Sequence, residues 1–233
     1  MNPAAYFQVA IDGPAAAGKS TVAALLAARI GGHYISTGAL YRAAAWFCLS
    51  HSVTPGTSAD SAVVELIPQC SLRYCMAGGE AVLHLNGRPV DNAALRTPQV
   101  AAVVSQTARI PEVRQKLLEV QRSCRELGIV IMEGRDIGTV IFPDARFKFF
   151  VTATPMERAR RRLAQPGETA SGATLESIAA AIAERDRIDS TRTVAPLRPA
   201  PDAVTVVTDG LNAGEVADKL AAVIHAGLGG GTR

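Results

Sequence analysis

The chain has 233 residues, of which 48% are apolar, so it can bury a substantial core and should fold as one domain with insertions. Its formal net charge of +3 is too small to indicate nucleic-acid binding by itself. Runs of about 18 apolar residues are absent from the sequence, as is the basic start of a signal peptide. We therefore expect a soluble, cytoplasmic monomer with neither a nucleic-acid nor a membrane partner.

The stretch from Tyr6 to Thr21 is the most informative, because an apolar run meets a Gly-rich turn and then a helix-forming run. The turn reads GPAAAGKS, the G-x-x-x-x-G-K-S pattern in its context of strand, loop and helix. Glycines let backbone N–H groups turn toward a phosphate, and the helix start adds its dipole. Lys19 would charge-pair with the outer phosphates, and the Ser20 hydroxyl can ligate Mg²⁺. The predicted nucleoside-triphosphate site consists of Gly13, Pro14, Ala15, Ala16, Ala17, Gly18, Lys19, Ser20 and Thr21.

Continuous apolar runs, which are typical of parallel strands buried on both faces, recur along the chain. Helical patterns lie between them, including one opened by Pro111 and one that starts near Asn212. Strands that alternate with helices predict a three-layer, doubly wound parallel α/β sheet. The five predicted strands are 7–11, 33–35, 129–132, 147–151 and 204–207.

Two regions break this alternation. Asn86-Gly87 lies between apolar runs, which is the strongest short signal for a hairpin, and predicts a small antiparallel insert of two or three strands. Residues 165–174 are rich in Pro, Gly, Ser and Thr and predict a mobile flap. Surface decoration is the alternative for both regions. The expected organisation is a P-loop core of 1–36, 98–156 and 175–233, an insert of 37–97 and a lid of 157–174.

Two polar clusters directly follow predicted strands. The run from Ser36 to Arg42 follows the second strand, where an open α/β sheet has its ligand crevice, so Arg42 could hold an anion or be a helix-surface charge. The run Glu133-Gly134-Arg135-Asp136 follows a buried strand, where two acids and an arginine require a ligand or one another. Glu133 takes the place of a Walker B carboxylate and could ligate Mg²⁺ through water or orient its neighbours.

Two further clusters lie on predicted helices. Arg158 and Arg162 are four residues apart and share a face, which fits either a lid that closes onto phosphates or a solvated basic face. Arg185, Asp189 and Arg192 also share one face, although solvated ion pairs would explain that pattern as well.

Together these clusters resemble the bacterial-type cytidylate kinases, within the nucleoside monophosphate kinases. The resemblance is carried by IDGPAAAGKST, STGALYR, TPQVAAVVSQTARIPEVR, EGRDIGTVIFPDA and ERDRIDSTRTVAPL, which span most of residues 9–199. The EGRDIGTVIFPDA run is the most specific of them, whereas the P-loop alone is not specific. Glu133 and Ser36 stand where the family often has Asp.

The resemblance implies phosphoryl transfer from ATP, with Mg²⁺, to CMP and to dCMP as a second acceptor. It implies a catalytic set of Lys19, Arg135, Asp136 and Arg185. Arg158 and Arg162 would cover ATP, and Ser20 would ligate Mg²⁺, with Glu133 a second candidate through water. The implied CMP site consists of Thr37, Arg42, Ser105, Arg114, Arg135, Asp136, Arg185, Asp189 and Arg192.

Within that site, the resemblance implies three groups of contacts. Arginines hold the CMP phosphate, an acid, a hydroxyl and an arginine bind the cytosine edge, and two residues of a predicted helix contact the ribose. A cytosine edge offers an N4 donor and O2/N3 acceptors, which suit the carboxylate of Asp136, the hydroxyl of Ser105 and the guanidinium of Arg114. The resemblance further implies that Arg42 and Arg135 hold the phosphate and that Arg185 and Asp189 contact the ribose. Arg192 would lie near Asp136 and support the pocket.

The proposed acceptor atom is a phosphate oxygen that is already anionic near neutral pH, so no general base is required. Two other classes of function stay open at this point. One is a P-loop kinase for another acceptor, such as UMP or a metabolite hydroxyl. The other is a nucleotide-dependent switch, although the sequence lacks the N-K-x-D run that GTPases usually carry for guanine.

Overall fold

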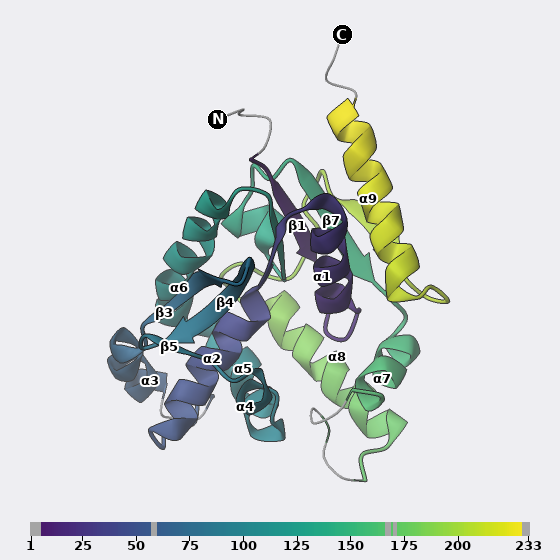
Figure 1. Cartoon of the computed structure of the whole chain (residues 1–233). Coiled ribbons are helices and arrows are strands. Elements are labelled where there is room, and N and C mark those ends of the chain that lie inside the picture. The colour runs from purple at the N-terminus through teal and green to yellow at the C-terminus, as the bar shows by residue number, and fades with distance from the viewer. Residues whose placement is uncertain (1–5, 57–59, 166–168, 170–171, 230–233) are drawn as a thin grey trace.

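The computed structural model describes residues 6–56, 60–165, 169 and 172–229, and in this part of the chain a five-stranded parallel sheet is joined by a three-stranded antiparallel one (Figure 1). The strand order of the large sheet is β2-β6-β1-β7-β8. The predicted α/β class, with five parallel strands and a small antiparallel insert, is confirmed. The strands are β1 (Gln8–Asp12), β2 (His33–Ser36), β3 (Leu72–Ala77), β4 (Glu80–Leu85), β5 (Arg88–Pro89), β6 (Val130–Gly134), β7 (Phe147–Thr152) and β8 (Val204–Val207).

Helices cover both faces of the large sheet and most of the insert. In the described ranges, no helix combines the length and the apolar character needed to span a membrane. The helices are α1 (Lys19–Ile30), α2 (Thr37–Ser50), α3 (Asp60–Leu66), α4 (Asn92–Leu95), α5 (Pro98–Arg109), α6 (Pro111–Ser123), α7 (Pro155–Leu163), α8 (Leu175–Thr191) and α9 (Ala213–Gly229).

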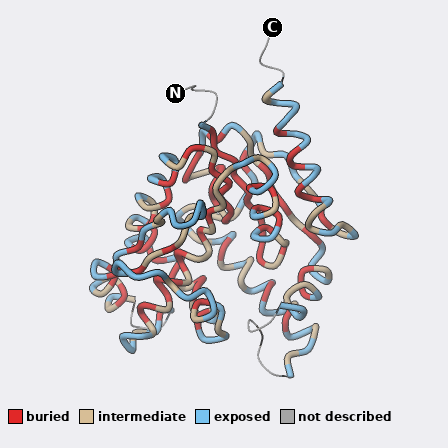
Figure 2. Tube along the Cα trace, in the orientation of Figure 1, coloured by how far each residue is buried: buried red, intermediate tan, exposed pale blue. Residues whose placement is uncertain are grey.

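Strand β1 lies at the centre of the large sheet, between β6 and β7, and all its residues are buried. Its side chains alternate between two cores, as a strand dictates. Ile11 packs with Leu26 of α1 and Leu220 of α9, whereas Ala10 packs with Phe142 on the opposite face. Figure 1 shows α1 and α9 side by side over the sheet, and Figure 2 shows the buried residues following these inner faces.

Three strands extend beyond the apolar runs into polar residues. Asp12 pairs with Gly134 in the ladder of β1 and β6, and Ser36 pairs with Glu133 in that of β2 and β6. These polar residues lie outside the apolar runs from which the strands were predicted, but their backbone groups still pair in the parallel ladder. The polar ends of β1, β2 and β6 are therefore held rigidly at one edge of the sheet, where ligands of open α/β folds bind.

The insert packs around its own core. Strands β3 and β4 pair antiparallel, and the turn between β4 and β5 has φ of 49° at Asn86 and 81° at Gly87, as the predicted Asn-Gly hairpin requires. Phe47 of α2 and Leu83 of β4 share this core with Leu117 of α6. The insert is thus continuous with α5 and α6, and its expected boundaries stay a proposal.

Helices α7 and α8 form an antiparallel pair on the other side of the molecule (Figure 1). Their apolar contact includes Ala159 and Ile182, and Ala15 of the loop after β1 belongs to the same small cluster. Of the lid expected at 157–174, residues 166–168 and 170–171 lie outside the described residues. The described part brings the α7–α8 pair against the P-loop.

The core can be tested at Leu26, which is 0% exposed between the sheet and α9. We expect Leu26→Ala to lower the free energy of unfolding by about 2–5 kcal/mol, because apolar contacts are lost and a cavity remains. Val223→Ala in α9, where the side chain is 42% exposed, is the matched control and should change stability by less than about 0.5 kcal/mol. Urea unfolding followed by circular dichroism measures both; equal losses would contradict the assignment of Leu26 to the core.

Candidate functional site

The loop between β1 and α1 has a backbone that favours glycine at two positions. Gly13 has φ of 149°, and a Cβ placed there would lie 2.0 Å from the Val151 carbonyl oxygen. Gly18 precedes α1 with φ of 85° and offers no side-chain cap, so the helix N-terminus stays available to an anion. The Lys19 ammonium donates to the Pro14 carbonyl at 2.7 Å, which bends the side chain back over the loop.

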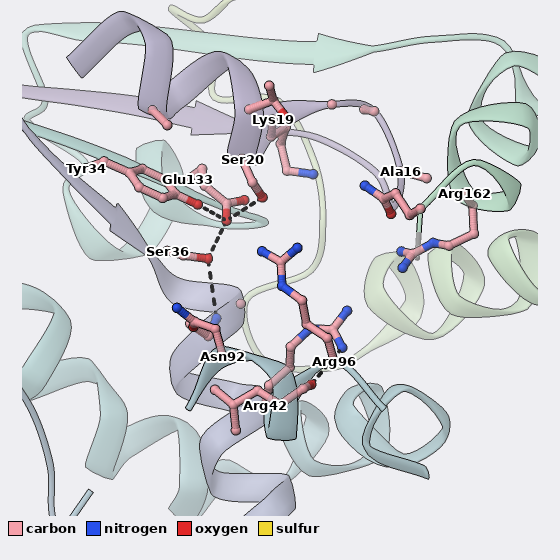
Figure 3. Close-up of a pocket in the computed structure, with 18 of the residues that line it drawn as sticks. Ala16, Lys19, Ser20, Tyr34, Ser36, Arg42, Asn92, Arg96, Glu133 and Arg162 are labelled. Atoms are coloured by element: carbon pink, nitrogen blue, oxygen red, sulfur yellow. Dashed lines mark hydrogen bonds between the residues drawn. The ribbon is translucent and has the colours of Figure 1, made fainter. Parts of the chain in front are cut away.

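A cavity of about 370 Å³ opens over this loop at the carboxyl edge of the sheet (Figure 3). Its walls come from the loop and α1, the ends of β2 and β6, α2, the insert around α4, α7 and α8. Basic side chains dominate it, and Glu133 is its acidic member. Such a pocket focuses positive potential and favours a multiply charged anion. The basic residues that line it are Lys19, Arg42, Arg96, Arg135, Arg162 and Arg185.

Four of these cations have pKa values lowered by burial and by neighbouring arginines. Burial, with a contribution from Arg135, lowers the pKa of Lys19 to about 7 and that of Arg185 to about 9. Burial and neighbouring arginines also lower the pKa values of Arg42 and Arg162, both to about 10. The Nε of Arg185 is buried and has no hydrogen-bond partner within the described ranges. An anion in the cavity would therefore relieve repulsion and satisfy an unused donor.

Hydroxyl groups surround the carboxylate of Glu133. Its Oε1 accepts from Ser20 at 3.1 Å, from Ser36 at 2.5 Å and from Tyr34 at 3.5 Å (Figure 3). The loop serine and a carboxylate thus lie side by side, and Mg²⁺ prefers one or two such protein oxygens together with phosphate oxygens and water. No group of three or more His, Cys, Asp or Glu able to hold a metal occurs in the described part of the chain. The donor set fits a Mg²⁺ that is shared with a phosphate ligand.

Next to the arginines that line the cavity, buried ion pairs hold two carboxylates. Asp136 pairs with Arg114, and Arg192 lies 3.7 Å from it. Asp189 accepts from the Nε of Arg135 at 2.8 Å. Burial by itself would raise the pKa of Asp189, but the facing guanidinium groups lower it overall. The lowered pKa keeps Asp189 an anion in a site of low exposure, so its carboxylate acts as an acceptor only.

The structure brings most of the predicted acceptor-site residues to one place. A small cavity of about 50 Å³ adjoins the large one, and Arg135 and Arg185 line both. The hydroxyl of Thr37 donates to the Glu133 carbonyl at 2.9 Å, while Arg42 lies in the large cavity and donates to the Leu95 carbonyl at 3.2 Å. The predicted residues around the small cavity are Thr37, Ser105, Arg135, Asp136, Arg185, Asp189 and Arg192.

The predicted donor-site residues divide into two groups. Ala16 to Thr21 line the large cavity together with Arg162, whereas Gly13, Pro14 and Ala15 do not line it. Arg158 lies away from it as well: its guanidinium donates to the carbonyls of Ala153 and Ala15, both at 3.1 Å, and pairs with Asp186.

Sequence reasoning missed several residues of the site. Arg96 lines the cavity from the end of α4 and is exposed; in the sequence it stands just outside the run TPQVAAVVSQTARIPEVR, which begins at the next residue. Asp12 accepts from the backbone N–H groups of Ile137 at 2.7 Å and Gly138 at 2.8 Å, and so fixes the turn that follows Arg135 and Asp136. Burial raises the pKa of Asp12 to about 7. The signals for Asp12 in the sequence were an acid at the end of an otherwise apolar strand and its place in the run IDGPAAAGKST.

The fold and this site define a P-loop protein with a pocket for nucleotide phosphates. A family model described as cytidylate kinase matches residues 9–226, so the chain belongs to the cytidylate kinase family. The resemblance predicted from the sequence is confirmed.

Relatives agree with this assignment. The chain is 41% identical over 210 residues to a cytidylate kinase of Streptococcus gordonii, covering 90% of this chain and 92% of that one. It is 44% identical over 218 residues to a bifunctional pantoate ligase/cytidylate kinase of Synechocystis sp. (strain ATCC 27184 / PCC 6803 / Kazusa), covering 91% of this chain and 41% of the relative. The chain thus spans about two fifths of the length of such bifunctional relatives.

Among solved structures, a shikimate kinase from Acinetobacter baumannii in complex with shikimate matches over 95% of this chain and 94% of that one. The sequence identity is 13% and the TM-score is 0.46, so this likeness adds nothing to the family assignment.

The buried state of Lys19 has a consequence for stability. Its pKa is lowered from 10.5 to about 7, so between these values the unfolded chain binds a proton that the folded chain does not, and the free energy of unfolding rises with pH. Lys19→Met removes this contribution. Urea unfolding of both proteins between about pH 7.5 and pH 9.5 should show the wild type gaining stability relative to the variant. A difference that is the same at every pH would contradict the lowered pKa.

Proposed function

We propose that the protein transfers the terminal phosphoryl group of ATP to CMP, giving ADP and CDP, with dCMP as a second acceptor. The observation that carries the proposal is the shared wall of the two cavities. Arg135 and Arg185 line both the phosphate pocket over the P-loop and the small cavity around Asp136. A donor and an acceptor nucleotide could therefore meet phosphate to phosphate, and membership of the cytidylate kinase family supports this arrangement.

On the donor side, backbone N–H groups of the loop and the N-terminus of α1 bind the ATP phosphates in this proposal. Lys19 contributes the charge nearest to the transferred group, and Arg162 contacts the phosphates from α7. Ser20 holds Mg²⁺, with Glu133 acting through water or by orienting the Ser20 hydroxyl, which it contacts at 3.1 Å. Held by these residues, Mg²⁺ would supply positive charge that neutralises part of the charge of the ATP phosphates.

On the acceptor side, Arg42 and Arg135 hold the CMP phosphate, and Arg185 and Asp189 contact the ribose. Asp136 accepts from the cytosine N4 amino group, and Arg114 donates to O2 and N3. Because Arg114 already pairs with Asp136, the carboxylate is oriented before the base arrives. Uracil presents O4 to the same carboxylate, a mismatch between two acceptors. Thr37, Ser105 and Arg192 complete the proposed pocket.

In the reaction, an anionic oxygen of the CMP phosphate attacks the γ-phosphorus of ATP as the bond to the β,γ-bridging oxygen breaks, and ADP leaves with the electron pair. The nucleophile needs no deprotonation near neutral pH, and His is absent from the residues that line the two cavities. Alignment and charge stabilisation by Lys19, Arg135 and Arg185 supply the catalysis. A monomeric state, a cytoplasmic location and the lack of a nucleic-acid partner stay predictions from the sequence.

A coupled ADP-release assay with ATP·Mg²⁺ and a panel of CMP, dCMP, UMP and AMP tests the proposed reaction. We expect turnover that depends on CMP and is much slower with UMP. Lys19→Ala should lower kcat by about 10² or more, because charge on the transferred group is then uncompensated. ADP release that does not respond to CMP would contradict the proposal and favour a nucleotide-dependent switch.

The proposed reading of the base can be tested at Asp136. Asp136→Asn replaces one acceptor oxygen by an amide donor, so the ratio of kcat/KM for CMP to that for UMP should fall by about tenfold or more. The control is Asp144→Asn, which breaks the exposed ion pair with Arg125. The control should leave the ratio unchanged, and an unchanged ratio in Asp136→Asn as well would remove Asp136 from the base site.

A further inference from the structure

The tip of the P-loop is bound from outside by side chains of α7 and α8. The backbone N–H of Ala15 donates to the Oδ1 of Asp186 at 2.9 Å. The carbonyl of the same residue accepts from the Nη1 of Arg158 at 3.1 Å, and this Nη1 also pairs with the Oδ2 of Asp186. The amide and carbonyl of one loop residue, one carboxylate and one guanidinium thus close a ring, called the Ala15 ring below.

The Ala15 ring is shielded from water. Ala15 is 1% exposed, and the side chains of Arg158 and Asp186 are 10% and 19% exposed. Ala15 also packs with Ile178 and Ile182 of α8 in the apolar cluster beside the ring. Charge-assisted hydrogen bonds in such surroundings are stronger than those at an exposed surface, and they fix geometry more tightly.

The Ala15 ring is anchored at its far end as well. The Nε of Arg158 donates to the carbonyl of Ala153, directly after β7, at 3.1 Å. The guanidinium is therefore engaged by acceptors of the protein at Ala153, Ala15 and Asp186, none of which lines the large cavity. This geometry gives Arg158 a role that differs from the expected direct contact with ATP.

Helix α8 carries Asp186 of the Ala15 ring directly beside Arg185, which lines both cavities. Asp186 holds the loop, while Arg185 reaches the large cavity and Asp189, one turn further, holds Arg135 at 2.8 Å. Because a helix is rigid over one turn, the position of Ala15 is coupled to those of Arg185 and Arg135. A shift of the loop relative to these two arginines would misalign the two phosphates, and misplacement by about 1 Å can cost about 10² in rate.

We propose that Asp186 and Arg158 are positioning residues, which hold the P-loop tip in register with the Arg135–Arg185 wall so that donor and acceptor phosphates align. They contact neither nucleotide. This inference rests on the proposed phosphoryl transfer to CMP, and it adds the residues that join the two half-sites.

The test compares Asp186→Ala with Glu184→Gln, which breaks an exposed ion pair with Arg187 on the same helix. We expect Asp186→Ala to lower kcat by about tenfold to a hundredfold while the Kd of CMP, measured by calorimetry, changes by less than about twofold. Asp186→Asn retains an oxygen for the Ala15 N–H and should recover part of the lost kcat. Glu184→Gln should match the wild type in both quantities.

A purely structural role would lower thermal stability and leave kcat per folded molecule unchanged, and that result would overturn the proposal. If Asp186→Ala does not fold, Asp186→Asn decides: a several-fold loss of kcat supports the proposal, and a wild-type kcat overturns it. Amide exchange of Ala15, followed by NMR, gives a readout that does not depend on activity. Exchange should accelerate in Asp186→Ala, or in the folded Asp186→Asn to a lesser degree, and unchanged exchange overturns the Ala15 ring.

The failure of this inference is distinguishable from that of the proposed function. A wild-type protein that releases no ADP in response to CMP refutes the proposed reaction. If the wild-type protein and the Asp186→Ala variant are equally active, the positioning role is refuted, but the proposed reaction is not.

Discussion

The site depends on an imbalance of charge that the protein creates and does not itself neutralise. An ammonium and five guanidinium groups line one cavity of about 370 Å³, with Glu133 as its acidic member. Their mutual repulsion, added to burial, lowers the pKa values of Lys19 and Arg185 well below those of free side chains. Phosphate groups of nucleotides are the anions whose charge density and oxygen geometry match such a pocket.

The fold makes this imbalance tolerable by holding three of the cations through contacts with the protein. Lys19 donates to the loop itself, Arg135 is held by Asp189, and Arg42 is held by the insert at Leu95. The parallel ladders of β1, β2 and β6 end at one edge, so the loop, Ser36 and Glu133 meet there. The Ala15 ring then connects the loop to α8, which carries Arg185 and, through Asp189, holds Arg135.

The parts of this design that are local in sequence were predictable from it. Apolar runs located all five strands of the large sheet, Asn86-Gly87 located the hairpin of the insert, and the glycines and Lys19 located the loop. The clusters after β2 and β6 and on α8 pointed to one crevice because carboxyl ends of parallel strands meet. The roles of these residues stay predictions, since geometry alone does not assign a ligand atom to each.

The parts that depend on distant contacts were not predictable. Asp186 and Ala15 are 171 residues apart in the sequence, and no pattern in either segment predicts their hydrogen bond. The contact of Arg158 with the Ala15 carbonyl also joins segments far apart in the sequence, which its helical spacing from Arg162 does not indicate. Arg96 approaches the cavity through the packing of the insert, which periodicity does not encode.

The structure of a complex with CMP and a non-hydrolysable ATP analogue would test the central claim most directly. We predict that the phosphates of both nucleotides lie between the loop amides, Lys19 and the guanidinium groups of Arg135 and Arg185. An acceptor phosphate bound away from these guanidinium groups would contradict the claim.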